Sequence, residues 1–269
     1  MIYPKPFAQF ICLVAILLGG FALAQAQQNP PVVSPSFIEA KVKRGSAYTQ
    51  TYTISNPTSE RVQLSCAVMD YWYDENNNSL LGRPGTLPRS ASPWVQFSPA
   101  EAIIEAHSSA EIKAIISVPY SAAGGYYTMP VFEVTPLSSS RAIRLRSLLM
   151  LATEDASEYQ LEVTGGKVSP LTKSEPLELN LDVCNRGIVH TSVRGIFAIL
   201  DAKGALAARG KIEDDKLLPG QRKMIKEPLV GELQTGSYTA VVTLIYERVG
   251  MEPATLVYEL PFEVSNAGK

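Results

Sequence analysis

Short runs of alternating apolar and polar residues make up most of this sequence, and they limit its fold to the all-β class. The run from Glu111 to Val118 places Ile112, Ala114, Ile116 and Val118 on one face, which is the pattern of a half-buried antiparallel strand. Comparable runs recur along the chain with turn signals such as Asn56-Pro57 between them. No long segment has the 3.6-residue period of an amphipathic helix. The pattern therefore predicts two tandem immunoglobulin-like β-sandwich domains.

A short acidic connection, Glu154–Glu158, separates the strands into two groups. We expect residues 33–153 to form the first immunoglobulin-like sandwich and residues 159–265 to form the second, which are ordinary domain sizes. In the second group, Tyr238 follows Gly236 at the start of a strand. This placement predicts a tyrosine corner, in which the Tyr hydroxyl bonds back to the backbone.

The N-terminal residues 1–26 have the features of a secretory signal peptide. Lys5 precedes the apolar run Phe7–Leu18, and small residues follow in the A-x-A pattern at Ala22–Ala26. No later apolar run reaches the roughly 20 residues that a membrane span needs. The mature chain is therefore expected in the periplasm or outside the cell, with no membrane span after signal cleavage.

The balance of charges argues against nucleic acid as a partner. The formal net charge is −2 and the sequence has no strongly basic block, whereas phosphate binding needs concentrated Lys and Arg. Charged residues at 19% and hydrophobic residues at 46% are ordinary for a globular chain, so disorder is not expected.

Candidate catalytic residues are few, because the sequence has only two His. His107 lies in an expected turn. His190 follows Cys184 by six residues, which would suit a Cys–His nucleophile, but Asn185-Arg186-Gly187 between them is typical of a hairpin turn. We predict a non-enzymatic protein with no catalytic residues and no cofactor.

Metal sites are also not expected. The two His and the two mature Cys lie far apart and show no zinc spacing. The segment Asp74–Asn78 resembles the start of a calcium loop, but Ser79 replaces the required Gly and Gly85 stands where the final Glu belongs. A polar turn is the favoured interpretation.

Other side chains admit two interpretations. Cys66 continues the apolar face of its strand and is expected to be buried and unpaired, while the burial of Cys184 stays open. The aromatic residues Tyr71, Trp72 and Tyr73 end a strand, where they would either stack on a sugar or pack within the protein, and packing is favoured.

The clearest functional signal lies in the stretch from Val118 to Ala152. Gly124-Gly125 precedes a strand, a polar turn follows at Leu137–Ser140, and a last alternating run closes the first domain. Such a run can pair with an added strand through its backbone. The two Arg on its polar face either grip a carboxylate or guard an exposed edge against aggregation. We predict that the partner-binding residues are Ile143, Arg144, Leu145, Arg146, Leu149 and Leu151.

Several residues of the first domain carry a resemblance to a known family. They are Asn56, Trp94-Val95, Ser98-Pro99, Val118-Pro119 and Gly125-Tyr126, together with the run from Ile143 to Leu151. The domain resembles the periplasmic pilus-assembly chaperones (PapD-like), which lend a strand to an incomplete pilin. The resemblance implies that Ile143, Leu145 and Leu149 would donate apolar side chains. The basic anchors of that family would fall near Ala40, with Lys41 adjacent, and at Met150, so the pilin carboxylate would need Arg144 or Arg146 instead.

The whole chain also resembles the two-domain cell-surface proteins that interact with WxL-type proteins. The residues that carry this resemblance are Asn185, Gly187 and His190, then Ile199, Asp201 and Gly204, and finally Leu218-Pro219-Gly220. It implies a binding protein of the cell envelope or surface that contacts peptidoglycan or surface proteins.

The sequence therefore predicts a chaperone-like periplasmic assembly protein that binds a protein partner through an exposed strand of the first domain. The partner would be a pilin-like subunit or a surface protein, with cell-wall glycan as a further candidate. The alternative is an envelope or surface binding protein of the WxL-interacting type.

Overall fold

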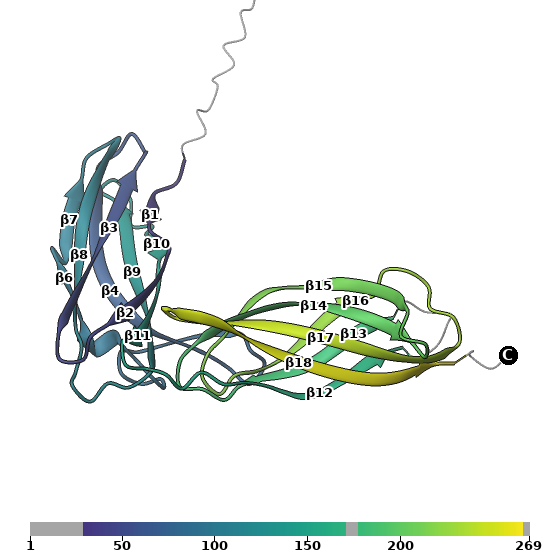
Figure 1. Cartoon of the computed structure of the whole chain (residues 1–269). Helices are drawn as coiled ribbons and strands as arrows, with labels where there is room; N and C mark the ends of the chain where they lie inside the picture. The colour runs from purple at the N-terminus through teal and green to yellow at the C-terminus, as the bar shows by residue number, and fades with distance from the viewer. Residues whose placement is uncertain (1–28, 171–176, 266–269) are drawn as a thin grey trace, which may run out of the picture.

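The computed structural model describes residues 29–170 and 177–265, and the expected signal peptide lies outside these residues. In the described part the chain forms two β-sandwiches joined in a bent arrangement (Figure 1). The described residues contain a single helical element, the 3₁₀ turn η1 (Ser92–Trp94). The predicted all-β fold of two immunoglobulin-like sandwiches is confirmed.

The first sandwich contains the strands from residue 32 to residue 153. Its strands are β1 (Val32–Ser34), β2 (Phe37–Val42), β3 (Ala47–Asn56), β4 (Val62–Tyr73), β5 (Ser79–Gly82), β6 (Val95–Ser98), β7 (Glu101–Ile104), β8 (Ser108–Ser117), β9 (Gly125–Pro136), β10 (Ile143–Arg146) and β11 (Leu148–Thr153). One sheet has the order β1-β3-β8-β6. The other has the order β2-β11-β9-β4-β5, with β10 beside β9 and β7 beside β4. The core between the sheets is built mainly from apolar side chains, and the rings of Tyr52 and Phe132 within it lie 5.0 Å apart.

The N-terminal strand of this sandwich changes sheets. β1 pairs with β3 in one sheet, and after Ser36 the chain continues as β2, which pairs in parallel with β11 in the other sheet. The consequence is local: β11 has a neighbouring strand on both sides, whereas β10 has one on a single side.

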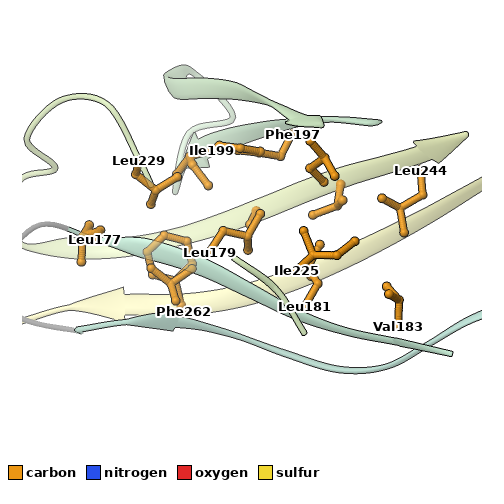
Figure 2. Packing of buried hydrophobic residues seen from close by; sticks show 14 of the residues in the cluster. Leu177, Leu179, Leu181, Val183, Phe197, Ile199, Ile225, Leu229, Leu244 and Phe262 are labelled. Atoms are coloured by element: carbon orange, nitrogen blue, oxygen red, sulfur yellow. The ribbon is translucent and has the colours of Figure 1, made fainter. Parts of the chain in front are cut away.

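The second sandwich contains the strands from residue 161 to residue 264. They are β12 (Leu161–Ser169), β13 (Glu178–Asn185), β14 (Thr191–Asp201), β15 (Leu206–Leu217), β16 (Arg222–Pro228), β17 (Gly236–Arg248) and β18 (Met251–Val264). The sheets have the orders β12-β13-β16 and β15-β14-β17-β18. Figure 2 shows how Leu179 and Leu181 of β13 face Phe197 and Leu244 of the opposite sheet. Complete burial of such a side chain contributes roughly 1.5–3 kcal/mol.

Two local features of the second sandwich follow directly from its sequence. The hydroxyl of Tyr238 donates a 2.9 Å hydrogen bond to the carbonyl of Gln234, which confirms the tyrosine corner. The turn after β14 has Gly204 at φ +81°. Oδ1 of Asp201 accepts hydrogen bonds from the backbone N–H groups of Lys203 and Ala205 and so closes that turn.

The Asn-rich segment after β4 is a polar turn, as expected. Oδ1 of Asp74 accepts hydrogen bonds of 2.8 Å from the backbone N–H groups of Asn76 and Asn78. This bonding explains the acidic and amide residues without a metal ion. The short strand β5 that follows was not expected, because Leu80 and Leu81 lack a clear alternation and gain their pairing from β4.

Asp70 of β4 is a buried carboxylate that sequence reasoning missed. It is 0% exposed, and it accepts hydrogen bonds from the backbone N–H groups of Gly85, Thr86 and Leu87 and from the Ser90 hydroxyl. Burial opposes ionisation, but hydrogen bonds from the serine hydroxyls and the backbone outweigh it and lower the pKa of Asp70. The loop from Gly82 to Pro93 is thus folded around one charge.

Both described cysteines are free thiols, as expected for Cys66, but the burial of Cys66 differs from expectation. Cys66 is half-buried rather than buried, whereas Cys184 is buried. At Cys66 the outer edge of β4 has no neighbouring strand, because β7 pairs with β4 only as far as Ser65 and β5 pairs with it only from Asp70 onward. The Cys66 N–H instead donates a 2.8 Å hydrogen bond to the Ala100 carbonyl. Desolvation, with a smaller effect of Glu101, raises the pKa of the Cys66 thiol to about 11.

Candidate partner-binding edge and interdomain joint

The strand β10 provides a free backbone edge on the first sandwich. It pairs with β9 in antiparallel register, with Ile143 opposite Val134 and Arg146 opposite Val131. No other described strand pairs with β10. A strand with one unpaired edge can accept another strand through its N–H and C=O groups.

The four residues of β10 offer both apolar and basic side chains to a partner. Ile143 is 39% exposed, and Leu145 is half-buried against the core of the first sandwich. Arg144 and Arg146 are both exposed. The strand β1 lies beside β10 in space (Figure 1), and its Val32 is 52% exposed. This side of the sandwich therefore has exposed apolar side chains next to an open backbone edge.

The other two predicted binding residues, Leu149 and Leu151, lie in the core. Both are 0% exposed, because β11 runs between β9 and β2 and its alternating side chains point between the two sheets. A partner has no access to these two side chains in the folded first sandwich. The accessible part of the predicted site is therefore Ile143–Arg146.

The two arginines of β10 have different surroundings. Nε of Arg144 lies 2.8 Å from Oε2 of Glu133, which is directly opposite on β9. Arg144 is thus part of a cross-strand ion pair, as an edge charge would be. Arg146 forms no ion pair with another described residue, so it is the one of the two that has its charge available for a partner.

The basic anchors implied by the chaperone resemblance are absent from their expected positions. Met150 is 2% exposed and packs with Tyr127 and Leu218, and Ala40 packs against the core. The adjacent Lys41 extends its Nζ to within 3.4 Å of the Gly250 carbonyl in the second sandwich. Positions 40 and 150 therefore offer no basic side chain to bind the carboxylate of a partner.

Aromatic residues at the end of β4 form part of the joint between the two sandwiches. Tyr71, Trp72 and Tyr73 pack around Tyr127 and around Leu218, which comes from the second sandwich. The hydroxyl of Tyr73 also donates a 3.1 Å hydrogen bond to the Pro219 carbonyl. The packing interpretation of these aromatics is therefore confirmed, and no sugar is needed to explain them.

Gly124 and Gly125 bring the two sandwiches into backbone contact. The N–H of Gly125 donates a 2.8 Å hydrogen bond to the Ile188 carbonyl. A Cβ at Gly124, where φ is +85°, would lie 2.4 Å from that carbonyl oxygen. The glycine pair that the sequence marks as a strand start is thus also a point of backbone contact between the sandwiches.

A buried histidine completes the joint. His190 is 1% exposed, with Nδ1 3.3 Å from the Tyr127 hydroxyl and Nε2 3.5 Å from Oε2 of Glu39. Lys216 of the second sandwich forms an ion pair with the same carboxylate. The pKa of Glu39 is lowered to about 2, chiefly by the adjacent His190 and also by Lys216, although partial burial of the carboxylate acts to raise it. Burial lowers the pKa of His190, although the neighbouring Glu39 carboxylate acts to raise it. His190 has a structural place here, next to Tyr127 and Glu39.

The joint should make stability depend on pH. The folded-state pKa of His190 lies below the usual value of 6.5, which applies to the unfolded chain. The stability that goes with neutral His190 is therefore complete above pH 6.5 and is lost as the pH falls from there through the folded-state pKa. Glu39 adds stability that is present above its usual 4.5 and is lost as the pH falls towards 2.

We therefore expect the free energy of unfolding to fall between about pH 7.5 and pH 5, and to fall less steeply in His190→Gln. Urea unfolding at a series of pH values checks this expectation. Parallel pH profiles for the two proteins would contradict it.

Among the described residues, no cluster of three or more His, Cys, Asp and Glu side chains is placed to hold a metal ion. Within residues 29–170 and 177–265, no helix has the length and apolar character needed to cross a membrane.

No family model matches this sequence, and no curated protein matches it. Solved structures do match. A chain from the chaperone–tip adhesin complex of CFA/I fimbriae biogenesis is 12% identical, with 86% of this chain and 98% of that chain covered at a TM-score of 0.52. The class 5 fimbriae chaperone CfaA is 13% identical, with coverage of 85% and 98% and a TM-score of 0.49. A chain of the CsuC–CsuE chaperone–tip adhesion subunit complex from Acinetobacter baumannii is 13% identical, with coverage of 85% and 98% and a TM-score of 0.42.

The likeness to the chain of the CFA/I complex extends over both sandwiches and over nearly the whole length of that chain, and at 12% identity it is evidence for the fold alone. The resemblance to PapD-like chaperones inferred from sequence is therefore supported by the structure: this chain has the two-domain, immunoglobulin-like fold of the PapD-like fimbrial chaperones.

Proposed function

We propose that this protein is a non-enzymatic, chaperone-like assembly protein of the periplasm that binds a partner protein along the free edge of β10. The observation that carries the proposal is the difference between two successive strands, β10 and β11. Leu149–Ala152 of β11 is paired on both sides, with β2 and with β9, whereas Ile143–Arg146 of β10 is paired on one side only. The fold shared with fimbrial chaperones supports an assembly role.

The chemistry of the edge suggests what the partner presents. An added strand would satisfy the N–H and C=O groups of β10, and Ile143 and Val32 would pack against its apolar side chains. Arg146 would bind a carboxylate of the partner through charge-assisted hydrogen bonds. A pilin-like subunit or another envelope protein with an incomplete sheet fits these requirements. A cell-wall glycan has no support from the comparisons. The aromatic residues of β4, which could otherwise stack on a sugar, pack within the interdomain joint.

Site-specific photocrosslinking in cells that make the protein tests the proposal. A photoreactive residue at position 143 should capture a partner, which mass spectrometry would identify. Ile103 provides a matched control, because it is 54% exposed and lies on β7, at the opposite edge of the same group of strands. Equal capture from positions 143 and 103, or no capture from position 143, would count against β10 as the interface.

The affinity of the identified partner should then depend on the residues of β10. Ile143→Asp should weaken binding at least tenfold, which corresponds to about 1.4 kcal/mol, because a charge would enter a desolvated contact. Ile103→Asp should leave binding unchanged. Arg146→Ser should weaken binding more than Arg144→Ser, since Arg144 is already paired with Glu133. If all four variants fold and bind with unchanged affinity, the partner binds elsewhere.

A further inference from the structure

The outer face of the four-stranded sheet in the second sandwich is unusually apolar for a surface exposed to water. Ile196 of β14 and Val257 of β18 are 58% and 59% exposed, and Leu206 of β15 is also 58% exposed. Sheets with one solvated face normally carry polar side chains there, and a contiguous apolar patch on such a face indicates an interaction surface.

A groove lies on this face. Its volume is about 620 Å³, and its lining includes Ile196, Ala198, Leu206, Arg209, Lys211 and Val241. The floor of the groove is formed by β14 and β17, and the basic side chains of β15 form one wall. The first sandwich contacts the second through other segments, such as the turns that contain Ile188 and Leu218, so it leaves this groove uncovered.

Charges of opposite sign border the apolar centre of the face. Strand register aligns Arg209 of β15, Ala198 of β14, Val241 of β17 and Glu259 of β18 in one row across the sheet. Residues directly opposite each other in neighbouring strands share a face, so the row runs from a basic to an acidic edge. Arg209 and Glu259 are exposed, and neither forms an ion pair with another described residue.

We propose that this face binds a second copy of the same chain. A two-fold axis that runs along the strands, between β14 and β17, would place β15 of each copy over β18 of the other copy. Each residue row would then face the same row in reverse order. Arg209 of each copy would thus lie opposite Glu259 of the other, and the apolar residues of β14 and β17 would meet at the centre. Such an interface uses one patch twice, as two-fold dimers do, with the modest rotation typical of aligned sheet packing.

The face is large enough for a reversible dimer. β14 contains 11 residues, and with ~3.3 Å per residue and ~4.8 Å per strand, four strands cover roughly 700 Å² per copy. Standard protein interfaces bury about 800 Å² per partner.

Sedimentation velocity of the mature chain at about 1 to 100 μM, a range in which modest interfaces associate, tests the proposal. The wild type should shift from monomer to dimer. Arg209→Glu and Glu259→Arg should each weaken dimerisation at least tenfold, because each variant faces like charges. The double variant that exchanges the two charges should dimerise again, which a general loss of stability would not allow.

Two further variants complete the design. Val241→Asp should prevent dimerisation independently of the charge pair, since it would place a charge opposite Ala198 of the other copy, at an apolar contact. Lys167→Glu makes the same sign change as Arg209→Glu on β12, in the other sheet, and should leave dimerisation unchanged. A wild type that stays monomeric, or a charge exchange that does not restore the dimer, overturns the proposal. So would binding of the β10 partner that depends on Arg209, because the face would then belong to that partner.

Discussion

Replacement of Asp70 by Asn should unfold the first sandwich at a much lower urea concentration than the wild type. The carboxylate is fully buried and accepts three backbone hydrogen bonds and one from the Ser90 hydroxyl. An amide would turn an N–H₂ group towards backbone N–H donors and leave some of them unsatisfied. Since hydrogen bonds to a charged group are worth roughly 1.5–3 kcal/mol each, we expect a loss of about 3–5 kcal/mol.

Tryptophan fluorescence during urea unfolding measures this effect, because both tryptophans of the chain, Trp72 and Trp94, lie in the first sandwich. Asp74→Asn is the matched control: the same substitution affects an exposed turn residue that also caps two backbone N–H groups. Its midpoint should move far less. Equal shifts for Asp70→Asn and Asp74→Asn would show that the buried charge does not hold the loop from Gly82 to Pro93.

Replacement of Gly124 by Ala should separate the two sandwiches. Gly124 has φ +85°, and an added Cβ would lie 2.4 Å from the Ile188 carbonyl oxygen. That oxygen also accepts the hydrogen bond from Gly125. Backbone strain and overpacking each cost about 1–3 kcal/mol. We therefore expect a total loss of about 2–6 kcal/mol in the stability of the joint, with a larger radius of gyration in small-angle X-ray scattering.

The chain offers a close control for this prediction. Gly204 has φ +81°, and an added Cβ there would meet nothing within 4 Å. Gly204→Ala carries the backbone strain without the clash, so it should cost about 1 kcal/mol and leave the overall dimensions unchanged. If the two variants have the same stability and the same radius of gyration, the contact between Gly124 and Ile188 does not hold the sandwiches together.

The local pattern of the sequence was enough for the fold class and for several turns. Strict alternation identifies which side chains share a face, because successive residues of a strand point to opposite sides. The alternation of Ile112, Ala114, Ile116 and Val118 therefore identified residues that do lie in the core. The tyrosine corner at Tyr238 and the turn closed by Asp201 also follow from short-range chemistry.

Local pattern does not reveal which strands become neighbours, and the candidate site depends on those neighbours. Leu145 and Leu149 occupy equivalent positions in one alternating run, but β2 crosses from the other side of the sandwich and covers only the part that contains Leu149. That crossing leaves Leu145 beside an open edge. The same limit applies to Cys66, which lies beyond the stretch of β4 that pairs with β7 and before the stretch that pairs with β5.

The sequence by itself determined most of the strands, several turns and the face on which the side chains of an alternating run lie, because these depend on residues close together in the chain. Tertiary structure alone decided that Ile143–Arg146 has a free edge, that Arg144 is paired and Arg146 is not, and that His190 lies against Glu39 and Tyr127. It also placed the aromatics of β4 around Leu218. Each of these facts requires contact between segments far apart in sequence, and alternation leaves such long-range pairing undetermined.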